Sequence, residues 1–208
     1  MNIETTTDER ILLKAHELFM LYGIRSVSMD EIAAHLGISK KTIYQFYADK
    51  DALVEDVILL ELEKSKTDCY TSKDASDNSI HEIFLAMDHF HETLTRMNMS
   101  IVYDLEKYHP KAYKIMTKYK HEFLFNEIKS NIERGINEGL YREGINVEIL
   151  ANYRIVTIFN VFNPETFPRG KYKLPEIVSE ITDNFLYGLT THKGQKLIEK
   201  YKQIRSKQ

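Results

Sequence analysis

The sequence predicts an all-α fold in which a small N-terminal three-helix unit precedes a larger helical domain. Apolar residues recur at helical spacing along most of the chain, and only four prolines and eight glycines interrupt its 208 residues. Hydrophobic residues make up 43% and charged residues 28% of the sequence, which is ordinary for a globular protein with a buried core. We expect a domain boundary after residue 49, so that residues 1–49 and 50–208 form the two parts.

Composition argues against several classes of protein. The single cysteine, Cys69, cannot form an intramolecular disulfide and suits a reducing compartment. The N-terminus lacks a signal-peptide pattern, and no apolar run approaches the ~18 residues that span a bilayer. We therefore expect a soluble, cytoplasmic protein without membrane contact. The formal net charge of −3 gives no support to nucleic-acid binding, so any such argument depends on where individual charges lie.

The first fifty residues contain start signals for three short helices. The first helix is expected over about residues 7–22, after a capping box formed by Thr6 and Glu9. A second capping box, formed by Ser28 and Glu31, opens the next helix. Both boxes satisfy backbone N–H groups that a helix start leaves without partners.

A sharp turn separates the second helix from the third. Gly37 supplies the left-handed backbone conformation that such a turn requires, and Ser39 can cap a third helix from Lys40 to about Tyr47. Apolar residues would face inward and hold the two helices at a steep angle: Ile32, Leu36, Ile38, Ile43 and Phe46. This spacing is that of a helix-turn-helix, although a plain structural pair of helices can show the same pattern.

The outward face of the third helix separates these two interpretations. With Ile43 and Phe46 inward, the residues left outside or flanking are Lys40, Lys41, Thr42, Tyr44 and Gln45. Lysine neutralises phosphates or approaches guanine, glutamine pairs with adenine, and a tyrosine hydroxyl can bond a phosphate oxygen. An exposed tyrosine beside lysine and glutamine is unusual for a merely solvated face. The face therefore predicts contact with double-stranded DNA.

A longer run of residues surrounds this motif. It comprises Ala15, Phe19 and Gly23, then Ser28-Met29-Asp30-Glu31-Ile32-Ala33, then Leu36-Gly37-Ile38-Ser39-Lys40-Lys41-Thr42-Ile43-Tyr44, then Phe46-Tyr47, Lys50 and Leu53. From Ile11 to Val57 the sequence resembles the tetracycline-repressor (TetR) family of transcriptional regulators. Members commonly carry tyrosine and then phenylalanine where this chain has Phe46-Tyr47, so the identity of the buried ring is left open.

The resemblance implies an all-helical homodimer with an N-terminal helix-turn-helix and a variable C-terminal domain for ligand binding and dimerisation. It implies a repressor that leaves its double-stranded DNA operator when a small-molecule effector binds. The DNA contacts expected on this basis are Ser28, Ser39, Lys40, Lys41, Thr42, Tyr44, Gln45 and Lys50. Tyr44 and Lys50 would chiefly hold phosphates, and Ser28 would touch the DNA backbone.

The remainder of the chain predicts further helices, beginning with a fourth that Asp49 can cap. This helix would link the two domains, so its tilt could set the spacing of two recognition helices. Residues 67–79, rich in Thr, Ser, Asp and Asn, are expected to form a loop. The later helices are expected over about residues 79–97, 99–108, 110–139, 147–162 and 175–189, with an exposed loop at 163–173 and a last short helix after residue 192.

Methionine and aromatic residues of the middle helices could line an apolar cavity for the effector. The candidates are Met87, Phe90, Met97, Tyr103, Tyr113, Met116 and Phe123. Methionine adapts to irregular space and tyrosine adds one polar tip to an apolar body. Each of these residues could equally fill an ordinary core.

Two late helices carry wide apolar faces that are expected to pack across a two-fold axis. The residues expected at this homodimer interface are Tyr153, Val156, Phe159, Ile177, Ile181 and Phe185. Burial within one chain is the alternative, and the resemblance to the TetR family favours the dimer.

Other chemistry is weakly represented. Asp88 and His91 would share a helix face, but without a second acid-x-x-His pair they predict a surface stripe, not a metal site. The chain has no glycine-rich phosphate loop, nucleophile elbow or zinc spacing, so we expect no enzyme, metal or cofactor. The basic tail after His192 is expected to be a solvated face. A helical enzyme or small-molecule carrier that uses the apolar cavity is the alternative function.

Overall fold

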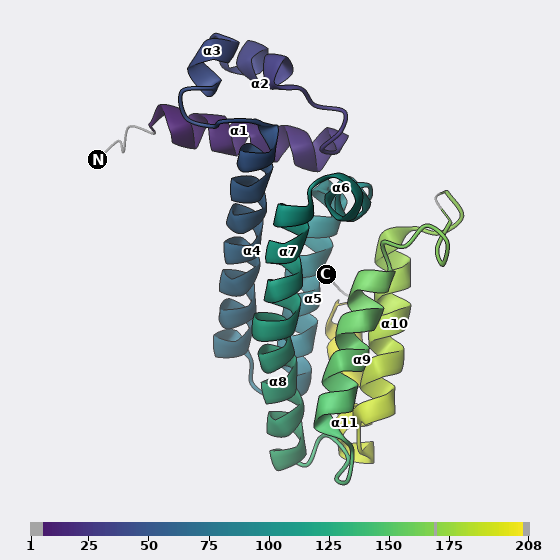
Figure 1. The fold of residues 1–208 in the computed structure, drawn as a ribbon. Helices are drawn as coiled ribbons and strands as arrows, with labels where there is room; N and C mark the ends of the chain where they lie inside the picture. The colour runs from purple at the N-terminus through teal and green to yellow at the C-terminus, as the bar shows by residue number, and fades with distance from the viewer. Residues whose placement is uncertain (1–5, 169, 206–208) are drawn as a thin grey trace. The chain divides into compact units, whose positions relative to one another are not determined.

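Helices form the regular structure of residues 6–168 and 170–205, the part of the chain that the computed structural model describes. Figure 1 shows them in chain order: α1 (Thr7–Tyr22), α2 (Met29–Leu36), α3 (Lys40–Ile43), α4 (Lys50–Ala75), α5 (Ser79–Arg96), α6 (Ile101–Tyr108), α7 (Pro110–Lys118), the π-helix η1 (Tyr119–Leu124), α8 (Phe125–Asn137), α9 (Val147–Asn160), α10 (Leu174–Leu189) and α11 (His192–Arg205). The predicted all-α fold is confirmed. Within the described ranges, no helix combines the length and apolar character needed to cross a membrane.

The helices group into two compact units. The first unit consists of the chain up to Lys64 together with Thr95–Lys118, and the second consists of Ser65–Leu94 together with the chain from Tyr119 onward. Helix α4 therefore contributes residues to both units. The expected boundary after residue 49 remains a prediction about function, since the unit that holds the first three helices also includes α6 and α7.

In the first unit, α1 lies across the start of α4, and α2 and α3 pack on it (Figure 1). Helix α1 begins at the predicted capping box, in which the backbone N–H of Thr6 donates to Oε2 of Glu9 at 2.9 Å. It ends at Gly23, whose φ is +85°. A Cβ at this position would also lie 2.7 Å from Oγ of Ser100, so both the backbone conformation and the close approach require glycine.

Helix α4 is longer than expected, and the predicted loop over residues 67–79 is wrong for most of its length. The helix continues to Ala75, and the connection to α5 is only residues 76–78. Tertiary contacts stabilise the polar end of the helix: Ser72 is buried, and Nζ of Lys73 lies 3.2 Å from the Glu127 carboxylate of α8. Packing thus overrides the loop composition of this segment.

The expected long helix after residue 110 runs unbroken to Asn137, but its middle is the π-helix η1. The rings of Tyr119 and Phe123 stack there with their centroids 5.3 Å apart, and Phe123 also meets the edge of Tyr70 of α4 at 5.5 Å. Oγ of Ser65 lies 2.7 Å from the Tyr119 hydroxyl. Wide π turns of this kind are frequent at functional sites, and Phe123 is one of the residues predicted to line the effector cavity.

The core of the second unit joins α5, α8, α9, α10 and α11. Its buried residues are Ile80, Phe84, Ile132, Leu140, Tyr141, Ala151, Phe185, Leu186, Leu189 and Ile198. Tyr141 lies at its polar edge, with its hydroxyl 3.2 Å from Oδ1 of Asn131 and 3.3 Å from the carbonyl oxygen of Ser79. The ring of Tyr141 lies against Gly135 of α8.

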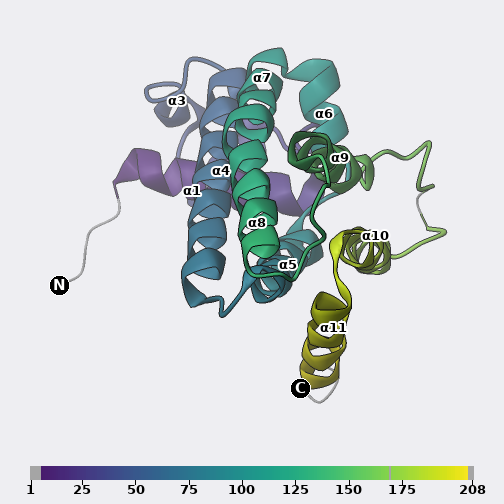
Figure 2. The ribbon, with the colours of Figure 1, turned by 90° about the horizontal axis from the view of Figure 1, so that it is seen from below.

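The basic tail forms α11, which is packed on the second unit. Figure 2 looks along α10 and shows α11 lengthwise, so these two helices cross. Nζ of Lys202 lies 2.6 Å from the Asp183 carboxylate of α10, and Arg205 pairs with Asp88 of α5. Two basic residues of the tail therefore form ion pairs that connect α11 to α10 and α5, and Asp88 is one of the acidic partners.

We predict that Gly135→Ala destabilises the protein. The added Cβ would lie 2.1 Å from Cδ2 of Tyr141, a buried ring with no room to move. Overpacking of this kind costs about 1–3 kcal/mol of the free energy of unfolding. A lowered midpoint of urea unfolding would register this loss.

Gly188→Ala is the matched control, because it makes the same change on helix α10. Apart from the neighbouring residues and backbone of α10 itself, no atom of the described residues lies within 4 Å of the added Cβ there. The higher helix propensity of alanine should leave stability unchanged or raise it by up to about 1 kcal/mol. Equal unfolding midpoints for the two variants would contradict the packing described for Tyr141.

Candidate nucleic-acid interface

The start of α2 is fixed by the predicted capping box. The backbone N–H of Ser28 donates to Oε2 of Glu31 at 2.6 Å, and the backbone N–H of Glu31 donates to Oγ of Ser28 at 3.2 Å. The Ser28 N–H lowers the pKa of the Glu31 carboxyl below its ordinary value, so this side chain is charged at neutral pH. A negative charge at a helix N-terminus is favourable, and the first turn of α2 is thereby held in place.

The turn between α2 and α3 is built as the sequence predicts. Gly37 has φ +67° and ψ +29°, the left-handed conformation, and its N–H bonds to carbonyls of the last turn of α2. Oγ of Ser39 then accepts the backbone N–H of Thr42 at 3.1 Å, which caps α3. A Cβ added to Gly37 would have no atom within 4 Å, so the backbone conformation alone explains the glycine.

The inner side of the motif settles which of the two adjacent rings is buried. Tyr47 is 7% exposed and Phe46 is 47% exposed, so the expectation that Phe46 faces inward is wrong. The backbone N–H of Tyr47 bonds to the carbonyl of Ile43, which places Tyr47 one turn beyond that fully buried residue. Ile32 and Ala33 of α2 complete the buried set, whereas Leu36 and Ile38 are only half-buried.

The expected third helix is shorter than predicted and ends at Ile43, so most of the residues expected to contact DNA lie on α3 or in the turn at residues 44–46 that follows it. Lys41, Tyr44 and Gln45 are exposed, and Lys41 has no ionic or hydrogen-bond partner among the described residues. Nζ of Lys40 lies 2.7 Å from the Asp30 carboxylate of α2, and this hydrogen bond raises the pKa of the lysine. The cation most available to a phosphate is therefore Lys41.

Two hydroxyl groups of the predicted set are used within the motif. Oγ of Ser39 and Oγ1 of Thr42 lie 2.8 Å apart, and Thr42 is half-buried. Ser28 is exposed, although its hydroxyl also lies 2.9 Å from the Glu31 carboxylate. These three hydroxyl groups belong to the same surface on which Lys41, Tyr44 and Gln45 are exposed.

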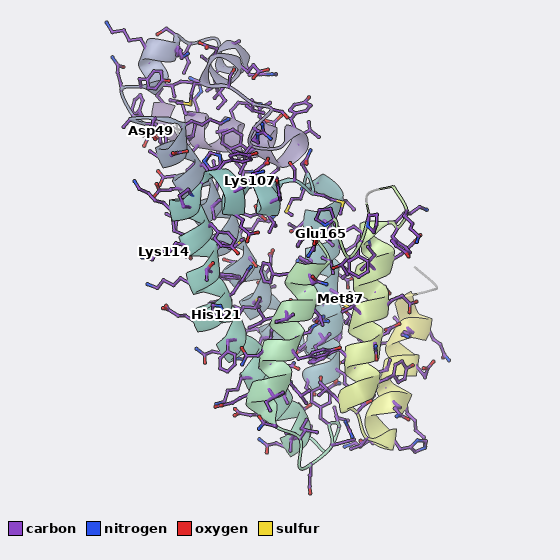
Figure 3. All side chains as sticks on the ribbon, turned by 45° about the vertical axis from the view of Figure 1, so that its right-hand side comes forward. Asp49, Met87, Lys107, Lys114, His121 and Glu165 are labelled. Atoms are coloured by element: carbon purple, nitrogen blue, oxygen red, sulfur yellow. The ribbon has the colours of Figure 1, made fainter. Side chains whose placement is uncertain are left out.

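Lys50 lies at the start of the fourth helix, as expected, but it has a hydrogen-bond partner within the chain. It is half-buried at the start of α4, and its Nζ donates to the carbonyl of Ile24 at 2.6 Å and lies 5.6 Å from the centre of the Phe19 ring. Burial lowers the pKa of Lys50. This side chain fastens the α1–α2 connection to α4, whose first turn is capped by Asp49 (labelled in Figure 3). We therefore omit Lys50 from the proposed DNA contacts.

The residues expected to line the effector cavity are divided between the two units. Met87, Phe90 and Phe123 belong to the second unit and are half-buried. Among those in the first unit, Met116 is buried, Met97 and Tyr113 are half-buried, and Tyr103 is exposed, with its hydroxyl accepting a hydrogen bond from Lys107. In the described part of the chain, no group of three or more His, Cys, Asp or Glu side chains is arranged to hold a metal ion.

The residues expected at the dimer interface also differ in exposure. Tyr153 and Val156 of α9 are 51% and 65% exposed, whereas Ile177 and Phe185 of α10 are buried within the chain. Phe159 and Ile181 are half-buried. Sequence reasoning missed Ile149, which is 64% exposed and precedes Tyr153 by four residues, so it extends the same apolar stripe. The nearly continuous apolar character of α9 was the signal that could have identified it.

Comparison with known proteins agrees with this geometry. Residues 11–57 match the model of the family described as bacterial regulatory proteins, tetR family. A Bacillus subtilis (strain 168) protein named YvaF, an uncharacterized HTH-type transcriptional regulator, is 28% identical over 192 residues, which cover 88% of this chain and 95% of YvaF.

Solved structures show the same fold at lower identity. A TetR-family regulator from Agrobacterium tumefaciens is 15% identical with a TM-score of 0.73, covering 88% of this chain and 97% of its own. A transcriptional regulator from Saccharomonospora viridis, solved in complex with choline, is also 15% identical, with a TM-score of 0.70 and coverage of 89% and 98%. The family model spans the helix-turn-helix, and the likeness in fold extends over nearly the whole chain. The chain is therefore similar to bacterial transcriptional regulators of the TetR family, by sequence over the helix-turn-helix at residues 11–57 and by fold over nearly its whole length.

Proposed function

We propose that the protein is a repressor that reads its operator with the outer face of α3 and leaves it when a small molecule binds the second unit. The observation that carries this proposal is the unpaired Lys41 of α3 together with exposed Tyr44 and Gln45 in the turn that follows, after a helix start fixed by Ser39. A rigid helix that presents polar side chains is what entry into the major groove requires.

Each exposed group has a definite role in this proposal. Lys41 neutralises a phosphate or approaches guanine, Gln45 pairs with an adenine edge, and the Tyr44 hydroxyl bonds a phosphate oxygen. Lys40 shares its charge with Asp30, so it contributes less to the affinity than Lys41 does. Ser28, Ser39 and Thr42 contribute hydroxyls near the DNA backbone.

Effector binding is assigned to the second unit. Its apolar residues Met87, Phe90 and Phe123 are only half-buried, which leaves apolar surface for a small molecule. The choline complex of the S. viridis protein is a precedent for a small ligand in this fold. Helix α4 has residues in both units, so an altered tilt of α4 could change the separation of two recognition helices.

Homodimerisation is assigned to the exposed apolar stripe of α9, formed by Ile149, Tyr153 and Val156. Half-buried Phe159 and Ile181 can border this stripe. The burial of Ile177 and Phe185 within the chain leaves them little surface to give to a partner. Two copies of the stripe related by a two-fold axis would cover each other, because an isologous interface uses the same surface twice.

The DNA contacts predict that Lys41→Ala and Tyr44→Ala weaken binding to a duplex selected by the wild-type protein. Losing one phosphate contact should lower the affinity about 5- to 10-fold and reduce the slope of log K against log salt by about 1 for Lys41→Ala. Binding would be measured by fluorescence anisotropy across a salt series, and both variants should unfold at the wild-type temperature.

Lys196→Ala is the control for this measurement, since Lys196 is an exposed lysine of α11 in the second unit. It should retain wild-type affinity and salt dependence. Unchanged DNA affinity in both α3 variants would refute the assignment of α3 as the DNA-reading helix.

The dimer assignment predicts that Val156→Glu produces monomers. A charge within the stripe would have to be desolvated on association, so sedimentation should report a mass near 24.4 kDa in place of twice that value. Thr71→Glu adds the same charge at an exposed position of α4 and should leave the dimer intact. A dimeric Val156→Glu variant would locate the interface elsewhere.

A further inference from the structure

A buried guanidinium without an acidic partner lies inside the second unit. Arg154 of α9 is 8% exposed and is the only lysine or arginine classed as buried in the described part of the chain. Its Nη2 donates to Oγ1 of Thr182 at 2.8 Å, whereas its Nη1 is buried without a hydrogen-bond partner. No carboxylate pairs with it among the described residues. Buried charges are normally paired, so this one requires an explanation.

The guanidinium keeps its charge in this position. Burial lowers the pKa of Arg154 to about 10, which still leaves the side chain protonated at neutral pH. Its carbon Cζ lies 5.0 Å from the centre of the Phe185 ring, which offers a π face but no negative charge. The hydroxyl of Thr182 accepts one N–H and retains its own proton to donate. Two hydrogen-bond donors, Nη1 and this hydroxyl, are therefore available at one place.

Arg154 points away from the surface that is assigned to the dimer. At 100° per residue, Ile149 and Val156 lie about 140–160° around α9 from Arg154. Ala151, which is fully buried, shares the side of Arg154, and Thr182 and Phe185 approach from α10. A carboxylate of a second copy packed on the α9 stripe would thus be on the wrong side of the helix. A ligand held between the helices is on the correct side.

Apolar side chains farther along α5 and α9 are less completely buried than those of the core. The tight core of the second unit includes Ile80 and Phe84 from the first turns of α5. Farther along the same helix, Met87 (labelled in Figure 3) and Phe90 are only half-buried. Ala151 belongs to the tight core, and Phe159, two turns later on α9, is half-buried. Arg154 therefore lies where the packing changes from tight to loose.

We propose that Arg154 and Thr182 bind the carboxylate of a monoanionic effector whose apolar body lies toward Met87, Phe90 and Phe159. A guanidinium and a hydroxyl can donate to the two oxygens of one carboxylate, and the single buried positive charge matches a single negative one. A dianionic phosphate would leave one buried negative charge uncompensated. A quaternary ammonium such as choline would be repelled. This inference rests on the proposed function only in calling the ligand an effector.

The test measures thermal unfolding of the full-length protein, without DNA, in the presence of defined probes. Decanoate and benzoate are the carboxylate probes, and decanol and choline are the neutral and cationic controls. Saturating decanoate or benzoate should raise the wild-type unfolding temperature by about 4 °C or more, whereas decanol and choline should shift it by less than about 1 °C. Decyl phosphate should stabilise less than decanoate does.

The variants separate a ligand site from a structural role. Arg154→Met keeps an apolar stem of similar length but removes the charge, so the unliganded protein should unfold at the wild-type temperature or above it. The same variant should lose the response to both carboxylates, and Arg154→Lys should retain part of it. A structural role would instead lower the unfolding temperature of Arg154→Met without ligand.

Two results would overturn the proposal. One is the absence of a shift in the wild-type protein with both carboxylates, and the other is an equal shift in Arg154→Met. Equal stabilisation by decyl phosphate would overturn the restriction to a single negative charge. Failure of the proposed function is measured separately, as absence of specific duplex binding by the unliganded protein, and it would leave the carboxylate site intact.

Discussion

The burial of Ile32 in α2 and of Ile43 in α3 is the constraint on which the proposed DNA-reading surface depends. Both side chains are fully buried, and the left-handed conformation of Gly37 turns the chain between their helices. Tyr47 and the Lys50–Ile24 hydrogen bond then fasten α3 and the α1–α2 connection to the rest of the first unit. The outer side chains of α3 are thereby held on a fixed helix, as the proposed DNA-reading role of this four-residue helix requires.

The second unit is stabilised in a different way, and this difference supports its role as a sensor. One end is a dense core, at whose polar edge the Tyr141 hydroxyl lies near Oδ1 of Asn131 and the carbonyl oxygen of Ser79. Farther along α5 and α9, apolar side chains are half-buried and the Arg154 guanidinium lacks an acidic partner. Natural proteins tolerate such costly groups chiefly where function uses them. The dense end supplies the stability that the looser region lacks.

Local signals in the sequence were sufficient for the helix-turn-helix, because its capping boxes, its turn glycine and its short-range packing all lie within a few residues. Local signals gave wrong predictions where contacts between residues distant in the sequence determine the structure. The polar end of α4 has the composition of a loop, and its helix is stabilised by the contact of Lys73 with the distant Glu127. The local sequence does not distinguish Phe46 from Tyr47, and the packing of the first unit buries Tyr47. Lysine is a residue type that suits a phosphate contact, but the amine of Lys50 donates a hydrogen bond to the carbonyl of Ile24. The unpaired state of Arg154 is a tertiary property that no local pattern contains.

Whether α3 reads DNA is tested most directly by selecting bound duplexes from a random-sequence library with the purified wild-type protein. We expect enrichment of a palindromic sequence. Hydroxyl-radical footprints on it should show two protected half-sites on one face of the duplex, about 34–36 Å apart or a multiple of one helical turn. Enrichment of no sequence, with weak binding that depends only on salt, would contradict the claim that α3 reads DNA.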